Sequence, residues 1–311
     1  MTNLTAEEVK ALKGRGFLRN KGTDCFSARI ITKNGVLTTR QAAVLAQAAE
    51  QFGDGKLALT TRLTVELTGI PYEKIEAFCD FIGKEGMTPG GTGPRVRPVV
   101  ACKGTVCVHG LYDTQAFAEE IHDAYYVGWY DVKLPHKFKI AVGGCPNNCV
   151  KPSLNDFGIV GQRVPLFDAD GCKGCGKCPP QNVCPVKAMH REGDSVILDE
   201  ARCVNCGKCI GACNFGCITE KASGFHIYIG GKWGKSSRAG TLVPGIFSKE
   251  EVFSMIEKAI LFYREQGFVG ERFGDMIDRL GEAAVIQALL SDDILSRKQA
   301  ILDAALHTAE A

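Results

Sequence analysis

The first 87 residues alternate between the apolar spacing of helices and that of strands. Thr5 with Glu8 forms a capping box that predicts a short helix, and Thr38 can cap a second one. Helices are expected over residues 5–13, 38–52 and from Pro71 onward, and strands over residues 25–32 and 56–68. This order of elements predicts a small α+β unit over residues 1–87.

The rest of the chain resumes this pattern after a turn-rich linker at residues 87–94. Asp113 can cap a helix that reaches about Tyr126, and Ser248 with Glu251 forms a second capping box. Buried strands are expected over residues 138–142, 157–161 and 225–229, with a helix over residues 248–266 and two further helices that close the chain.

Composition narrows the classes of function. With 311 residues and 45% hydrophobic content, the chain can bury a sizeable core in two or three structural units. A net charge of +2 gives no support for nucleic-acid binding. The first residues lack a basic region followed by an apolar run, and the apolar segments are too short for a membrane span. We therefore expect a cytoplasmic protein, whose clustered cysteines are metal ligands rather than disulfides.

Four of the 15 cysteines surround the centre of the chain, with the spacings Cys102-x4-Cys107 and Cys145-x3-Cys149. A helix that starts near Pro146 would place the second pair one turn apart, where both thiolates can reach one metal cluster. The two glycines before Cys145 let the backbone approach a bulky prosthetic group. The alternative, four buried structural thiols, does not explain this ordered spacing.

Nine more cysteines lie in a segment of residues 167–222 that interrupts the strand pattern as an insertion. Eight of them form two ferredoxin motifs, each with three closely spaced cysteines and a fourth downstream that ligates the other cluster. One four-iron cluster is expected on Cys172, Cys175, Cys178 and Cys213, and another on Cys203, Cys206, Cys209 and Cys184. Cys217 could replace Cys213, and zinc is the alternative metal for either motif.

The central stretch resembles the siroheme and iron–sulfur site of the sulfite and nitrite reductase family. The resemblance rests on the cysteine pair at 102 and 107, on Lys137-Phe-Lys139 and on Gly143-Gly-Cys145-Pro-Asn-Asn-Cys149, and residues 59–70 are similar to the family's ferredoxin-like half domain. It implies that Cys102, Cys107, Cys145 and Cys149 ligate a four-iron cluster, and that Cys149 is shared with the siroheme iron.

The resemblance also implies an α+β fold in three parts. A ferredoxin-like half domain would occupy residues 1–87, and a siroheme α/β domain would be split into residues 88–166 and 223–311. A bacterial-type ferredoxin domain with two [4Fe-4S] clusters would be inserted between them at residues 167–222. The whole combination is similar to the catalytic subunits of the anaerobic, dissimilatory type of sulfite reductase.

The same resemblance assigns contacts to the substrate and to siroheme. Lys137 and Lys139 alternate along a predicted strand, so that their ammonium groups share one face. With Arg29 and Arg97 they match the family's residues that bind the anion and supply protons, and Arg95 competes with Arg97 for its place. Leu63 stands where the family usually has glutamine. The expected siroheme contacts are Thr60, Arg62, Arg95, Asn147, Cys149, Gly230, Lys235 and Arg238.

These likenesses imply the six-electron reduction of sulfite to sulfide, with electrons entering through the ferredoxin insert. Two alternatives stay open: nitrite reduction to ammonia at the same site, and a non-catalytic iron–sulfur electron-transfer protein. Because flavin and nicotinamide motifs are missing from the sequence, we expect a separate donor protein, such as a ferredoxin or a flavin or iron–sulfur reductase. One half domain, where the long reductases have two, implies a homo-oligomer or hetero-oligomer.

Overall fold

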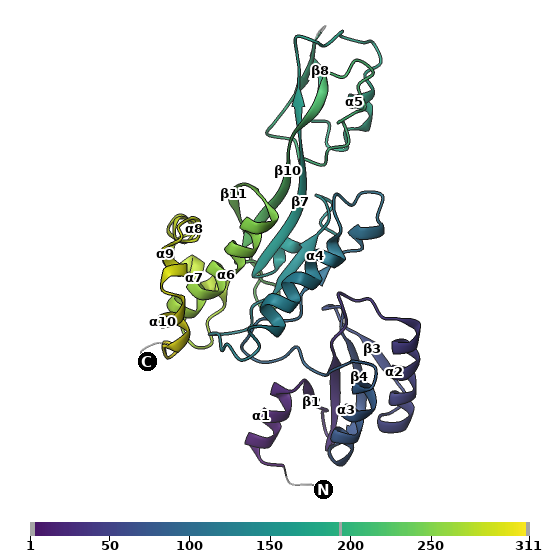
Figure 1. The fold of residues 1–311 in the computed structure, drawn as a ribbon, viewed down its shortest axis with the longest axis vertical. Coiled ribbons are helices and arrows are strands. Elements are labelled where there is room, and N and C mark those ends of the chain that lie inside the picture. Colours follow the sequence, from purple (N-terminus) through teal and green to yellow (C-terminus); the bar gives the residue numbers. More distant parts are fainter. Residues whose placement is uncertain (1–3, 193–194, 309–311) are drawn as a thin grey trace.

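The structure, a computed structural model, describes residues 4–192 and 195–308. Three parts follow one another along its long axis (Figure 1): a small sheet unit at the N-terminal end, a central sheet with helices, and a cysteine-rich lobe at the far end. Among the helices of these described residues, none combines the length and the apolar character that crossing a membrane requires.

The N-terminal unit is a four-stranded antiparallel sheet in the order β1-β2-β4-β3. Its strands are β1 (Phe17–Arg19), β2 (Cys25–Ile30), β3 (Leu57–Leu59) and β4 (Val65–Pro71). The accompanying helices are α1 (Ala6–Gly14), α2 (Thr39–Phe52), the short 3-10 turn η1 (Tyr72–Lys74) and α3 (Ile75–Gly83). Capping boxes at Thr5 and Thr38 satisfy the free N–H groups at the starts of α1 and α2.

The continuous strand predicted over residues 56–68 is wrong. The chain turns back between β3 and β4, so this segment forms a hairpin. Leu63 takes a left-handed conformation with φ of 57°, and the hydroxyls of Thr60 and Thr64 are hydrogen-bonded at 2.7 Å across the turn. Strand-forming side chains did not reveal this turn because it depends on one residue's unusual φ.

The central unit is a five-stranded mixed sheet in the order β11-β10-β7-β6-β5. Its strands are β5 (Val100–Ala101), β6 (Ile140–Gly143), β7 (Phe157–Phe167), β10 (Ile218–Ile229) and β11 (Thr241–Phe247). The pairs β5–β6 and β6–β7 are parallel, whereas β7–β10 and β10–β11 are antiparallel. The loops that follow β5 and β6 therefore emerge at the same edge, and both carry cysteines.

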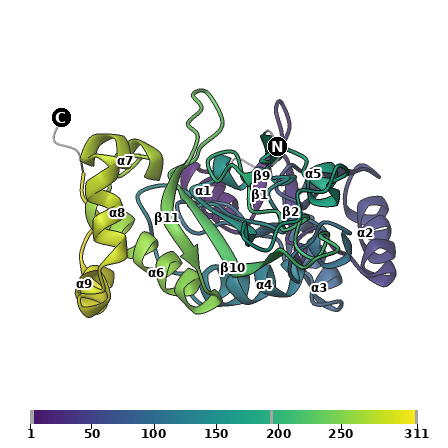
Figure 2. The ribbon, with the colours of Figure 1, turned by 90° about the horizontal axis from the view of Figure 1, so that it is seen from above.

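Helices cover this sheet. Asp113 caps α4 (Thr114–Ile121), which runs on into the π-helical segment η3 (His122–Val127), and Ser248 caps α6 (Lys249–Gln266). Seen from above (Figure 2), α4 and α6 lie on one side of the sheet. Four short helices follow where two were predicted: α7 (Phe273–Leu280), α8 (Glu282–Leu290), α9 (Asp293–Ser296) and α10 (Lys298–Asp303).

The cysteine-rich lobe sits at the end of a long ribbon formed by β7 and β10 (Figure 1). The pairing of these strands extends out to Phe167 and Ile218, so residues 168–217 connect two neighbouring strands. The lobe contains α5 (Pro179–Val183) and a hairpin of β8 (Met189–Glu192) and β9 (Ser195–Leu198) around a small core of its own.

Candidate active site

The loop between β6 and β7 carries the second cysteine pair of the central stretch. The helix predicted from Pro146 is wrong: residues 144–151 form turns, followed by the 3-10 turn η4 (Pro152–Leu154). Asn148 and Lys151 have φ values of 54° and 49°, and such left-handed residues interrupt a right-handed helix. Cys145 and Cys149 are therefore presented by a turn.

The four cysteines of the central stretch nevertheless come together. Burial raises the pKa of Cys145, and neighbouring thiolates at Cys102, Cys149 and Cys107 raise it further. The backbone N–H of Gly144 donates to the sulfur of Cys102 at 3.2 Å. Backbone N–H···S bonds of this kind tune thiolate ligands of iron–sulfur clusters, so this donor set fits such a cluster.

Glycine is required beside these cysteines for steric reasons. A Cβ on Gly144 would lie 3.0 Å from Thr114 Cγ2 and 3.4 Å from the sulfur of Cys102. A Cβ on Gly104, in the 3-10 turn η2 (Gly104–Val106), would lie 2.5 Å from the same Thr114 methyl group. The two cysteine loops thus approach each other through backbone alone.

Cationic side chains from five segments of the chain converge near the start of β6, with mutual repulsion among them. Burial, and then repulsion by Arg62, lowers the pKa of Lys139 to about 8. Burial also lowers the pKa of Arg62 and of Arg97 to about 10. The set, called the cationic cluster below, comprises Arg29, Arg62, Arg97, Lys137, Lys139 and Arg272.

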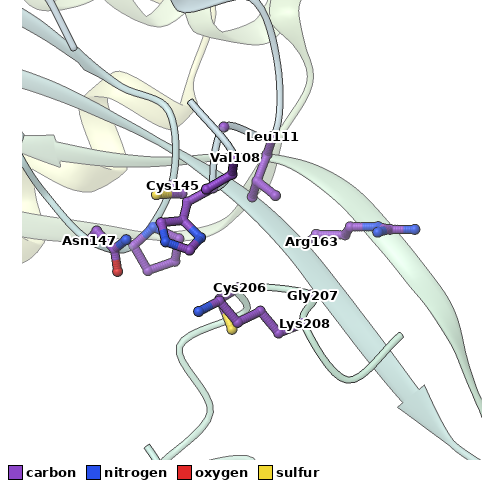
Figure 3. Close-up of a pocket in the computed structure, with 11 residues that line it drawn as sticks. Val108, Leu111, Cys145, Asn147, Arg163, Cys206, Gly207 and Lys208 are labelled. Atoms are coloured by element: carbon purple, nitrogen blue, oxygen red, sulfur yellow. The ribbon is translucent and has the colours of Figure 1, made fainter. Parts of the chain in front are cut away.

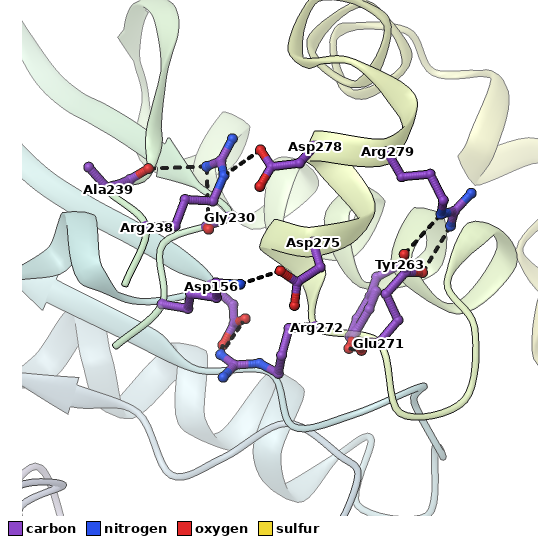
Figure 4. Close-up of polar contacts among 11 residues, drawn as sticks. Asp156, Gly230, Arg238, Ala239, Tyr263, Glu271, Arg272, Asp275, Asp278 and Arg279 are labelled. Atoms are coloured by element: carbon purple, nitrogen blue, oxygen red, sulfur yellow. Dashed lines mark hydrogen bonds and ion pairs between the residues drawn. The ribbon is translucent and has the colours of Figure 1, made fainter. Parts of the chain in front are cut away.

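A fully buried carboxylate organises this cluster (Figure 4). Arg272 Nη2 donates to both oxygens of Asp156, at 2.8 and 2.9 Å, and the backbone N–H of Lys139 donates to Oδ2 at 2.9 Å. No local motif pointed to this pair, because Asp156 precedes β7 and Arg272 precedes α7, 116 residues later.

Several nitrogens around this cluster have no partner. Within residues 4–192 and 195–308, the buried side-chain nitrogens without a hydrogen bond are Arg62 Nε, Arg95 Nη1, Arg97 Nε and Arg272 Nε. Buried donors are almost always satisfied, so four orphans in one region indicate that a group with several anionic oxygens belongs there. Siroheme, whose periphery carries many carboxylates, fits this donor set, as does a small oxyanion.

Arg62 and Arg29 of the cationic cluster have different hydrogen-bond partners. Arg62 donates to Asn155 Oδ1 at 2.7 Å and to the carbonyl of Pro98 at 2.8 Å, and the hydroxyl of Thr60 accepts the backbone N–H of Arg62 at 3.2 Å. Arg29 Nε donates to Glu66 at 2.8 Å. The contacts of Arg62 fix the N-terminal unit against the central one, and Glu66 holds Arg29 at the edge of the cluster.

Arg95 and Arg97 take different positions. Arg95 lies over the ring of Tyr130, 4.2 Å from its centroid, whereas Arg97 faces Arg29 and Arg272 and donates to the carbonyl of Gly91. Arg97 is therefore the member of this pair that belongs to the cationic cluster. A siroheme contact by Arg95 remains a prediction.

The loop of residues 230–240 lies beside α7. Arg238 forms an ion pair with Asp278 at 2.8 Å and donates to the carbonyl of Gly230 (Figure 4). It forms a second ion pair with Glu282, also at 2.8 Å. Lys235 is exposed. The structure thus compensates the charge of Arg238 with acidic residues of α7 and α8, and siroheme contacts by Gly230, Lys235, Arg238 and Asn147 remain predictions.

In the lobe, the cysteines of the second motif meet Cys184 of the first. Burial raises the pKa of Cys209 to about 11, and neighbouring Cys203, Cys206 and Cys184 contribute. The N–H of Ala188 donates to the sulfur of Cys184 at 3.2 Å, and that of Asn205 to the sulfur of Cys203 at 3.5 Å. The four thiols of one predicted ligand set are thus neighbours, and their role as cluster ligands remains a prediction.

The other set includes Cys213, whose sulfur accepts backbone N–H groups of Cys217 and Phe215 that hold its pKa below the usual range. Cys217 is buried beside Cys213 and Cys172. Cys213 and Cys217 therefore both lie next to the predicted site, and the choice of Cys213 as the fourth ligand remains a prediction. Among the described residues, no three Cys, His, Asp or Glu side chains are close enough to hold a single metal ion. A four-iron cube spreads its thiolates more widely than one ion does.

A pocket separates the central cysteines from those of the lobe (Figure 3). Cys145 and Asn147 line one side, Cys206, Gly207 and Lys208 line the opposite side, and Arg163 of β7 lies at the edge. The N–H of Arg163 donates to the carbonyl of Asn205 at 2.8 Å, which ties the second cysteine motif to β7. Of the two predicted ligand sets, the one that contains Cys206 thus faces the central cysteines.

Comparison with known proteins adds independent findings. Residues 92–294 match the profile of the nitrite and sulphite reductase 4Fe-4S domain, and residues 18–81 match the nitrite/sulfite reductase ferredoxin-like half domain. Over 69% of its length the chain is 35% identical to a coenzyme F420-dependent sulfite reductase of Methanocaldococcus jannaschii, and this match covers 34% of that protein. Over 51% of its length it is 31% identical to a component of the anaerobic sulfite reductase of Salmonella typhimurium, and this match covers 49% of that component.

The fold agrees with these matches. A crystal structure of dissimilatory sulfite reductase I superimposes with a TM-score of 0.68 at 20% identity, covering 86% of this chain and 69% of that one. The chain spans about a third of the length of the F420-dependent relative and about half that of the Salmonella one. The matched domains cover both sheet units and the cysteines between them, and the chain belongs to the siroheme-dependent nitrite and sulfite reductase family.

Proposed function

We propose that this chain reduces sulfite to sulfide at a siroheme held next to a four-iron cluster. The observation that carries the proposal is the cationic cluster with its orphaned arginine nitrogens, in a domain that also groups four cysteines. Arg62 of this cluster donates to Asn155, which lies near the end of the β6–β7 connection that carries Cys145 and Cys149. When bound, siroheme would supply an iron centre that accepts the anion and passes electrons to it singly. Cys102, Cys107, Cys145 and Cys149 would hold the cluster, and Cys149, which is exposed, is the one open to sharing.

The cationic side chains would bind the substrate and deliver protons. Sulfite is an anion whose oxygens must leave as water, so its reduction needs positive charge and proton donors at the same place. Lys139, with its pKa lowered to about 8, can release a proton near neutral pH more readily than an ordinary lysine. Arg29, Arg97 and Lys137 complete the proposed anion site, and Asp156 with Arg272 holds it in place.

Electrons would enter through the lobe of residues 168–217, as a ferredoxin domain with two [4Fe-4S] clusters. The set of Cys184, Cys203, Cys206 and Cys209 is proposed as the inner cluster, since the Cys206 loop faces Cys145 across the pocket of Figure 3. The set of Cys172, Cys175, Cys178 and Cys213 would be the outer cluster, where a separate donor protein delivers electrons. An oligomer completes the proposal, because the Salmonella relative is named as one subunit of its reductase.

Turnover assays with reduced viologen test this proposal. The anaerobically purified protein is expected to oxidise reduced viologen when sulfite is added and to release sulfide. Fast nitrite reduction beside slow sulfite reduction would make the protein a nitrite reductase at the same site. Failure to reduce either anion, despite a full iron content, would support an electron-transfer protein instead.

A further inference from the structure

Tyr126 occupies an unusual place in the helix that borders the cationic cluster. It lies in the π-helical segment η3, is 4% exposed, and its hydroxyl accepts the backbone N–H of Gly91 at 3.0 Å. The wider helical turn is shown by the N–H of Gly128, which donates to the carbonyl of Asp123 five residues earlier at 2.9 Å. Such single π turns re-aim side chains and are frequent at functional sites.

The neighbouring Tyr125 has a different partner. Its hydroxyl donates to the carbonyl of Phe253 in α6 at 2.7 Å, so it joins two helices of the central unit. The two adjacent tyrosines therefore both hydrogen-bond to backbone groups. Tyr125 bonds to α6, whereas Tyr126 bonds to Gly91, which contacts the cationic cluster.

The backbone that Tyr126 holds contacts two arginines of the cluster. Gly91 has φ of 72°, and its carbonyl accepts a hydrogen bond from Arg97 Nη1. A Cβ on Gly91 would lie 3.6 Å from Arg29 Cδ, and the N–H of Gly90 donates to the carbonyl of Arg29 at 2.8 Å. A Cβ on Gly90 would lie 2.6 Å from the hydroxyl oxygen of Tyr126, so the contact depends on glycine.

We propose that Tyr126 is a positioning residue for the anion-binding site, which acts on Arg97 through the backbone of Gly91. Arg97 is repelled by Arg29, Arg95 and Arg272, and the Gly91 carbonyl is what holds its guanidinium among these like charges. The Tyr126 hydroxyl holds the N–H of the same glycine, one peptide unit before this carbonyl. A fixed donor lowers the ordering cost of binding an anion. This inference rests on the proposed sulfite site.

The test compares Tyr126→Phe with Tyr125→Phe in the anaerobic holoenzyme. Both variants lose one hydroxyl bonded to a backbone group, so both should lose similar stability and retain siroheme. Tyr126→Phe is expected to raise the Kd of sulfite, measured by calorimetry on the oxidised protein, by about 5- to 10-fold. It should raise KM similarly, with little change in kcat, and speed hydrogen exchange at the Gly91 amide. Tyr125→Phe should change none of these.

A double-mutant cycle with Arg97→Ala separates positioning from general packing. If Tyr126 acts through Arg97, the double variant with Tyr126→Phe and Arg97→Ala has the same sulfite Kd as Arg97→Ala alone. An additive rise, or equal Kd values in the two tyrosine variants, overturns the inference while the proposed function stands. Wild-type protein that lacks siroheme and does not bind sulfite would overturn both.

Discussion

Arg272 binds both carboxylate oxygens of Asp156, at 2.8 and 2.9 Å, and places a buried negative charge among the cations of the proposed active site. That negative charge offsets the mutual repulsion of the surrounding cations, which include Lys137, Lys139, Arg62 and Arg97. The Lys139 N–H bond to Asp156 also fixes the point from which its side chain leaves the backbone.

Replacing Arg272 should therefore destabilise the protein strongly. Arg272→Met leaves Asp156 buried without its ion-pair partner, and the expected loss is about 3–5 kcal/mol in the free energy of unfolding. Urea denaturation of the purified protein measures it. Arg297→Met is the control. It removes the ion pairs of Arg297 with Glu265 and Asp293, and because the Arg297 side chain is 45% exposed the expected loss is about 0–1 kcal/mol. Equal losses of unfolding free energy in the two variants would show that the Asp156–Arg272 pair does not organise the cluster.

The pH dependence of sulfite binding should reflect Lys139. Burial lowers its pKa to about 8, so the ammonium is charged below that pH and loses its charge above it. KM for sulfite should accordingly rise as the pH passes the pKa of Lys139. In Lys139→Arg the guanidinium stays charged, and the rise should move to higher pH. Because the titration of sulfite itself is common to both proteins, identical profiles would show that Lys139 does not contact the anion.

The two lysines should be needed for turnover and not for assembly. Lys137→Ala and Lys139→Ala are expected to retain siroheme and to lose most sulfite reduction, by about 100-fold or more for loss of a proton donor. Lys133→Ala, an exposed lysine on the same segment, should behave as wild type. Unchanged rates in both active-site variants would remove these residues from the mechanism.

Iron content should distinguish cysteine ligands from packed thiols. Cys206→Ser is expected to lose the inner cluster, about four irons per chain, and with it the transfer of electrons from the outer cluster. Cys213→Ser should lose the outer cluster, whereas Cys217→Ser should keep it. Loss of iron from Cys217→Ser together with full iron in Cys213→Ser would exchange the roles of these two residues. Cys79→Ser, a thiol of the N-terminal unit, is the control.

Sequence reasoning worked where the signal is local. The capping boxes at Thr5 and Ser248 fix where α1 and α6 begin, because the bonding groups are three residues apart. Local signals failed where a single φ decides, as at Leu63 in the β3–β4 hairpin and at Asn148 in the cysteine turn. Side-chain preferences for strand or helix do not report such left-handed residues.

The active site divides in the same way. Lys137, Lys139 and the cysteines carry their spacing in the sequence. The structure groups the two lysines with other cations and the four central cysteines with one another. Asp156 and Arg272 belong to no local motif, and their pairing requires the starts of β7 and α7 to meet in the folded chain. The contact of Tyr126 with Gly91 could not be predicted either, because the direction of the Tyr126 side chain depends on a π-helical turn that has no local sequence signal.

The visible absorption spectrum of the anaerobically purified protein is the decisive measurement for a siroheme coupled to an iron–sulfur cluster. We expect the bands of siroheme over the broad absorption of iron–sulfur clusters, with changes in those bands when sulfite is added. A spectrum with iron–sulfur absorption alone, from protein with its full complement of cluster iron, would contradict the proposed catalysis.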